Sequence, residues 1–238
     1  RARYTSLRYP LVEPPTGRAD ERLELRLFVC SASFTYNYDA VGRLTEERQN
    51  GVALATYTYD ANSNRLTATT PTSSVTGTYD AQDRLLSYGA HDYTYTPNGE
   101  LTSKRNRLTG DLTTYTYDVL GNLTAVVLPD ATQITYVLDG ANRRIGKRVN
   151  GTLVQGFLYA DGLRPIAELD GSGAVVSRFV YATRPNAPDY LIQGGVSYRI
   201  LTDHLGSPRL VINTTTGQIV QRMDYSAFGE VLADTNPG

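Results

Sequence analysis

The chain has 238 residues, 40% of them hydrophobic and 20% charged, and its formal net charge of −1 excludes the global positive field typical of nucleic-acid or anionic-membrane binding. The single cysteine, Cys30, excludes an internal disulfide framework and a multi-cysteine metal site. The sequence contains no run of about 18 apolar residues, so it predicts no membrane-spanning helix. Its first residue is not Met and no signal peptide is visible, which indicates a piece of a longer protein.

Residues 1–33 do not follow the pattern of the rest of the chain. They are rich in Arg and Glu, and Pro10, Pro14 and Pro15 interrupt them early. Apolar residues then alternate with other side chains from Leu23 to Val29, which is typical of a strand leading into the next segment. A strand, a linker and a boundary segment all remain compatible with this stretch.

From residue 34 to residue 145 the chain repeats one short pattern, of which Tyr57–Thr67 (YTYDANSNRLT) is the clearest copy. The position before the aspartate falls at residues 38, 59, 79, 95, 117 and 138, so the intervals are 21, 20, 16, 22 and 21 residues. A period near 21 is the signature of a repeat array. It fits two strands and two tight turns per unit.

Each unit predicts a hairpin with two chemically different faces. Tyr57 and Tyr59 are two residues apart and therefore share one face, whereas Thr56 and Thr58 point to the other. The aspartate after the second tyrosine is expected to accept backbone N–H groups, while Gly or Asn supplies the positive φ of the turn. Because one hairpin is marginally stable in water, neighbouring units must stack, and we interpret the tyrosine stripe as packing.

After residue 145 the repeat spacing continues, but the sequence of each repeat differs from the pattern above. Asn150-Gly151 predicts a tight hairpin turn, and Asp170-Gly171 predicts a second one. Residues 183–197, with two prolines and Gly194-Gly195, are expected to form a long irregular connection. A last hairpin is predicted around Thr216-Gly217-Gln218.

These motifs resemble the YD repeats and the start of the associated core of the RHS (rearrangement hot spot) family. The repeat residues that carry the resemblance are Tyr38, Asp39, Gly42, Tyr59, Asp60, Tyr79, Asp80, Tyr117, Asp118 and Gly121. The core residues are Asp203, His204, Gly206, Pro208, Arg209, Asp224, Tyr225, Phe228 and Gly229. The resemblance divides the chain into a leading segment (1–33) that it does not cover, repeats (34–182) and a truncated core (183–238).

The resemblance implies an all-β fold of stacked antiparallel hairpins that form a curved, spiralling sheet, part of a β-shell or barrel. In bacterial members such a shell encloses a variable toxic domain, which several members release by aspartate-dependent self-cleavage. This sequence ends before the rest of that core, so we expect cleavage and toxicity to belong to a longer parent chain.

No residue pattern here predicts catalysis, a cofactor or a metal. We interpret His204 as part of a structural loop, His91 as a turn residue, Cys30 as a small buried side chain and Glu46-Glu47 as a solvated face. Gly171-Ser172-Gly173 lacks the context of a dinucleotide loop, and the basic run 104–107 is one solvated cluster. The Asn-x-Thr triplets at Asn122, Asn150 and Asn213 matter only in a secreted eukaryotic protein.

The resulting hypothesis is a non-enzymatic shell segment of a secreted or cell-surface bacterial protein. Its partners would be the rest of the parent chain and a C-terminal effector domain, with no nucleic acid and no membrane span. The alternatives are a surface adhesion module that binds glycans and, third, a peptidase or glycosidase.

Overall fold

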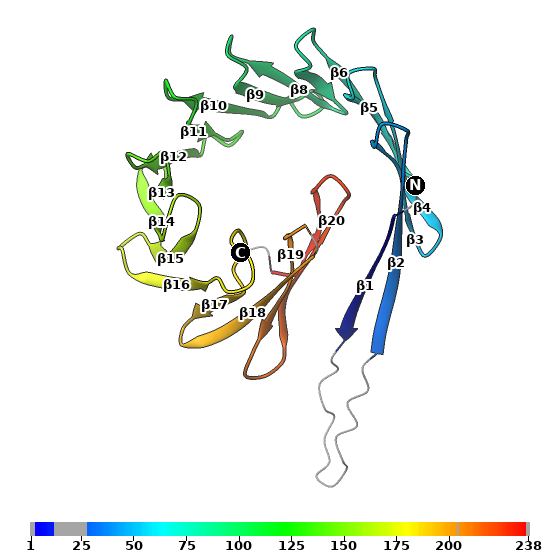
Figure 1. Cartoon of the computed structure of the whole chain (residues 1–238). Helices are drawn as coiled ribbons and strands as arrows, with labels where there is room; N and C mark the ends of the chain where they lie inside the picture. Colours follow the sequence, from blue (N-terminus) through cyan, green and yellow to red (C-terminus); the bar gives the residue numbers. More distant parts are fainter. Residues whose placement is uncertain (1–2, 12–27, 204, 237–238) are drawn as a thin grey trace. The chain divides into compact units, whose positions relative to one another are not determined.

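The computed structural model describes residues 3–11, 28–203 and 205–236 (Figure 1). It divides into two compact units, one within residues 1–93 and 106–108, the other within residues 94–105 and 109–238. Twenty-one strands lie in the described residues, and among these residues there is no helix long and apolar enough to cross a bilayer. The all-β prediction is therefore confirmed.

The first unit is an antiparallel sheet in which every strand pairs with the next one in sequence. Its strands are β1 (Arg3–Leu11), β2 (Phe28–Tyr38), β3 (Leu44–Gln49), β4 (Val52–Tyr59), β5 (Arg65–Thr69), β6 (Ser74–Tyr79), β7 (Leu85–Tyr88) and the start of β8 (His91–Tyr95).

In the second unit the strands from β9 to β21 also form an antiparallel meander. Its strands are β9 (Leu101–Asn106), β10 (Leu112–Tyr117), β11 (Leu123–Val127), β12 (Gln133–Leu138), β13 (Arg144–Val149), β14 (Thr152–Tyr159), β15 (Pro165–Asp170), β16 (Val175–Val180), β17 (Tyr190–Gln193), β18 (Val196–Thr202), β19 (Pro208–Asn213), β20 (Ile219–Tyr225) and β21 (Val231–Asp234).

The register slips by one residue at each tyrosine–aspartate turn. Thr58 pairs with Thr67 but Tyr59 pairs with Arg65, so Leu66 is an extra residue in β5. Such a bulge needs a left-handed residue at the turn. That residue is Ser63 here and Gly121 in the turn after β10, with φ of 75° and 81°. The bulge leaves Leu66 unpaired, and the pairing of β4 with β5 continues on both sides of it.

The two faces of the first unit differ as predicted. On the tyrosine face, Tyr57 is 7% exposed, and Gly77 leaves room for the neighbouring tyrosine rings. The opposite face carries paired hydroxyls, because Thr58 lies 2.7 Å from Thr67 across the ladder (Oγ1 to Oγ1). Cross-strand hydroxyl pairs of this kind add a few tenths of a kcal/mol each, up to about 1.

Two sequence predictions about the second unit are wrong in detail. Residues 190–193 form β17, and Gly194-Gly195 is a two-residue hairpin turn with φ of 58° and 79°, so the irregular connection ends at Asp189. The chain also does not reverse at Asp170-Gly171 alone. The N–H of Asp170 reaches the carbonyl of Ala174, and Gly173 holds the positive φ of 88°.

Two further turn predictions are confirmed, and the predictions about the leading segment are tested only in part. The Asn150-Gly151 turn and the hairpin around Gly217 are confirmed, with positive φ at each of these glycines and at Asn150. Part of the expected leading strand lies outside the described residues, although β2 begins at Phe28. The backbone of Cys30 pairs with that of Tyr9, while the Cys30 side chain lies outside the described part. The divisions at residues 33 and 182 stay predictions.

Candidate functional site: the ladder of tyrosine–aspartate turns

Each repeat turn is organised by the carboxylate of its aspartate, and Asp39 is the first copy. Its Oδ1 accepts the N–H groups of Val41 at 3.1 Å and Arg43 at 2.9 Å, while Arg43 Nε donates to Oδ2 at 2.6 Å. The N–H of Asp39 also donates to the carbonyl of Arg43 at 2.9 Å. The side chain therefore closes the turn that the backbone bulge requires.

The same closure recurs in the other units. Oδ1 of the aspartate accepts the N–H of the residue four positions on at Asp60, Asp80, Asp118, Asp139, Asp170 and Asp203. The backbone N–H of Arg43 holds the pKa of Asp39 below its ordinary value, and the side-chain amide of Asn122 does the same for Asp118. The carboxylates of Asp39 and Asp118 therefore stay ionised as acceptors, which does not suit a general acid.

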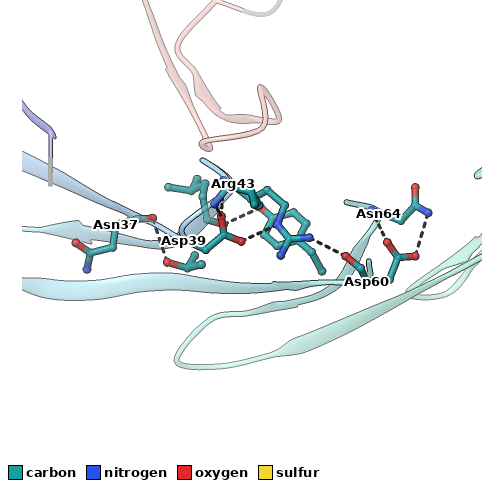
Figure 2. A network of polar contacts seen from close by, with 9 residues as sticks. Asn37, Asp39, Arg43, Asp60 and Asn64 are labelled. Atoms are coloured by element: carbon teal, nitrogen blue, oxygen red, sulfur yellow. Dashed lines mark hydrogen bonds and ion pairs between the residues drawn. The ribbon is translucent and has the colours of Figure 1, made fainter. Parts of the chain in front are cut away.

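The residue four positions after the aspartate connects one repeat to the next repeat. Arg43 Nη1 donates to the carbonyl of Asp60 at 2.7 Å, and its guanidinium lies 5.0 Å from the ring centroid of Tyr59. Figure 2 shows Arg43 between the two aspartate turns, with dashed contacts to both. Asn64 occupies the equivalent position one unit later and donates to Asp83 Oδ1 at 2.7 Å.

The tyrosine before the aspartate makes the opposite connection, back to the preceding strand of the array. The hydroxyl of Tyr59 donates to the carbonyl of Leu44 at 2.6 Å, and that of Tyr79 donates to the carbonyl of Arg65 at 3.0 Å. Tyr159 and Tyr181 repeat this contact in the second unit. Burial raises the pKa of Tyr59 and Tyr79, so the hydroxyls stay protonated donors.

Replacing Tyr59 by phenylalanine is expected to lower the free energy of unfolding by about 1 kcal/mol, because the Leu44 carbonyl loses its donor. Urea denaturation of both proteins measures the difference. Tyr38→Phe is the matched control, since Tyr38 holds the same repeat position, is 38% exposed and donates to no described residue. Equal losses in the two variants would contradict this role of the hydroxyl.

The residues of the predicted core motif form one more turn of the same kind. Asp203 Oδ1 accepts the N–H groups of Leu205 at 2.9 Å and Ser207 at 3.0 Å, and Gly206 has a φ of 95°. Pro208 begins β19, and His204 lies outside the described residues.

Beyond that turn, Arg209 brings the two halves of the predicted motif together. Arg209 Nη2 lies 3.3 Å from Asp224 Oδ1, and its guanidinium lies 5.4 Å from the ring centroid of Tyr225. Gly229 holds a positive φ of 83° in the next turn, and Phe228 beside it is exposed. Arg209 thus joins the first half of the motif to Asp224 and Tyr225 of the second half.

The residues considered for chemistry do not assemble into a reactive set within the described part of the chain. His91 begins β8 rather than lying in a turn. The solvated-face interpretation of Glu46-Glu47 is wrong for Glu47, which is 6% exposed, and Glu46 is paired with Arg48 at 2.8 Å. No group of three or more potential metal ligands occurs among the described residues.

Sequence reasoning missed the arginine or asparagine that follows five of the turn aspartates (Asp39, Asp60, Asp80, Asp118 and Asp139) by four positions. The signal was present, because this spacing joins Asp39 to Arg43, Asp60 to Asn64 and Asp139 to Arg143. The arrangement supplies hydrogen bonds along the array in both directions. The contacts of these turns therefore serve to hold neighbouring repeats together.

Comparisons with known proteins give a consistent family. A family model described as the teneurin YD-shell matches residues 23–238. Human teneurin-4 is 27% identical over 224 residues, which are 91% of this chain and 8% of teneurin-4. The tRNA nuclease WapA of Bacillus subtilis is 28% identical over 198 residues, which are 81% of this chain and 8% of WapA.

Among solved structures, the Photorhabdus luminescens Tc holotoxin pore is similar with a TM-score of 0.41 and 15% identity, over 91% of this chain and 14% of that one. The chain spans only about 8% of the length of the curated relatives that it matches. The similarity begins at residue 23, eleven residues before the regular repeats that the sequence reveals.

Proposed function

Because this chain belongs to the teneurin YD-shell family, whose model matches residues 23–238, we propose that it is a wall segment of a larger shell. The wall confines a C-terminal effector domain of the same parent protein until delivery to a competitor or host cell. The segment itself is not an enzyme, and its parent works outside the producing cell.

The observation that carries this proposal is the pair of contacts that joins neighbouring repeats in opposite directions, seen in both compact units. Arg43 reaches forward to the next turn at Asp60, and Tyr59 reaches back to Leu44. Units tied in this way depend on their neighbours, as in other repeat arrays, and can continue into further units. A continuous wall needs such units, whereas an independent catalytic domain does not.

The enclosed partner is supported by analogy with the relatives only. WapA is named as a tRNA nuclease, and the match covers 8% of it, so most of that protein lies outside the similarity. For the present chain, we place any toxic activity in a domain beyond the matched region. The sequence of the parent gene would identify the effector domain and the route of delivery.

The first experiment is to sequence the gene past codon 238 and express the whole parent protein. We expect the remainder of the core and then an unrelated domain that resists a protease in the intact protein. The same domain made alone is expected to be digested at least about tenfold faster, since an enclosed chain is cleaved only after the wall opens.

A control keeps wall integrity separate from the presence of the domain. In the parent protein, Tyr59→Phe combined with Tyr79→Phe removes two contacts between neighbouring strands and should speed digestion of the downstream domain. Tyr38→Phe should not. A downstream domain digested at equal rates inside and outside the parent would overturn the proposal.

A carbohydrate-binding surface remains the second proposal, carried by the exposed hydroxyl face of the first unit. Thr56, Thr58, Thr76 and Thr78 are exposed there and offer hydrogen-bond donors and acceptors. The tyrosines that would stack on sugar rings lie on the other face, with Tyr57 almost buried. A glycan array with no signal above background would remove this function.

A further inference from the structure

The connection between β16 and β17 borders an open hollow that the repeat ladder does not explain. Residues 182–189 fold back against β18, and the hollow between them has a volume of about 180 Å³. It is lined by Thr183, Arg184, Ala187, Asp189, Arg199 and Thr202, among others, all in the second unit. Two arginines and one aspartate therefore line one small space.

The carboxylate is already satisfied by its own loop. Asp189, 5% exposed, accepts the N–H groups of Ala182 and Thr183, both at 2.7 Å, and the hydroxyl of Thr183 at 2.6 Å. The Thr183 hydroxyl is the largest cause that lowers the pKa of Asp189 to about 2. Asp189 thus stays charged and holds the loop closed.

Arg199 is only loosely engaged by this carboxylate. Its Nη2 lies 3.4 Å from Asp189 Oδ1, longer than a charge-assisted hydrogen bond, and its guanidinium lies 4.7 Å from the ring centroid of Tyr190. A guanidinium has five N–H donors, so most of those on Arg199 are left for another acceptor.

Arg184 is fixed by the predicted core motif rather than by a carboxylate. Its Nη1 donates to the carbonyl of Asp203 at 2.9 Å, and the same nitrogen would lie 3.7 Å from a Cβ added to Gly206. Arg184 is half-buried. With Arg199 it gives the hollow two positive charges against the single negative charge of Asp189.

We propose that this hollow binds one small oxyanion, a phosphate or a carboxylate group, between Arg184 and Arg199. The planar guanidinium fork matches the paired oxygens of such groups. The site commits to the chemistry of the oxyanion, whose source is either a free phosphate or an acidic group of a polypeptide. It does not depend on the shell function.

The test follows the Nε–Hε signals of the arginines by NMR in the full chain during titration with phosphate or with acetate. Sodium chloride keeps the ionic strength constant. We expect saturable shifts at Arg184 and Arg199. In Arg184→Gln the midpoint concentration should rise at least about tenfold, as removal of charge-assisted hydrogen bonds predicts.

Arg178→Gln is the matched control, because Arg178 lies on β16 of the same unit, is exposed and does not line the hollow. It changes the net charge equally and should keep the wild-type midpoint. If Arg184→Gln does not fold, Arg184→Lys keeps the charge without the fork and should still weaken binding.

The source of the oxyanion follows from the two titrations. Tighter binding of acetate indicates a carboxylate from a polypeptide, and tighter binding of phosphate indicates a phosphate group. Shifts that grow linearly without saturation, or equal midpoints in Arg184→Gln and Arg178→Gln, would overturn the site.

Discussion

Alanine in place of Gly171 is expected to lower the free energy of unfolding by about 3 kcal/mol, the upper part of the range for overpacked sites. A Cβ at this position would lie 2.1 Å from the carbonyl oxygen of Leu153 and 3.1 Å from its carbon. Both are backbone atoms of the neighbouring strand β14, so neither can rotate away. The β14–β15 pairing must shift to admit the methyl group.

Gly140→Ala provides the control for this substitution. Gly140 follows Asp139 in its turn as Gly171 follows Asp170, yet a Cβ there would meet nothing within 4 Å. Urea denaturation should therefore give a near-wild-type midpoint for Gly140→Ala and a clear decrease for Gly171→Ala. Similar midpoints for the two variants would show that the close approach to Leu153 relaxes at little cost.

The second large effect is expected at Asp189. Asp189→Ala leaves the N–H groups of Ala182 and Thr183 and the guanidinium of Arg199 without their acceptor inside a folded loop. Removing one partner of a buried charged network is among the most destabilising single changes. We expect the melting temperature to fall by about 5 °C or more, and Asp111→Ala, at an exposed turn, to change it little.

The same residue gives a pH dependence with a definite sign. The pKa of Asp189 is about 2 in the folded chain against an ordinary 3.8, so its ionisation stabilises the fold above the ordinary value. That contribution disappears as the pH falls from about 4 through 2. The stability gap between wild type and Asp189→Asn should therefore narrow between pH 5 and pH 2, and a constant gap would contradict it.

Local sequence patterns predicted most of the fold. The alternation of Tyr57 and Thr58 predicted the two faces of the sheet, and the aspartate after the second tyrosine predicted the turn, because both depend on residues close in the chain. The expected Gly with positive φ is present at Gly121, but Ser63 holds this position in the clearest copy, so that prediction is wrong there. The strand β17 was missed because its four residues follow a proline-rich loop, and the Gly194-Gly195 turn was counted with that loop.

The candidate site was harder to predict because its contacts join residues from different units. Arg43 and the Asp60 carbonyl are 17 positions apart, and nothing local in the sequence marks a carbonyl as the acceptor. The burial of Glu47 likewise depends on β2 and β4, which flank it in the sheet. The turn propensity of a short segment contains no information about which carbonyl accepts the Arg43 hydrogen bond or which strands flank Glu47.

The two-way contacts of the repeat also determine how the array responds to mechanical load. Because each hairpin pairs mainly with its immediate neighbours, with added contacts such as those of Arg43 and Tyr59, a pulling force applied at one end loads mainly the outermost hairpin. Rupture should then proceed one unit at a time, each releasing a period of about 21 residues, or roughly 70 Å of extended chain. A repeat array of this kind resists force as a whole, yet it unfolds stepwise from an end.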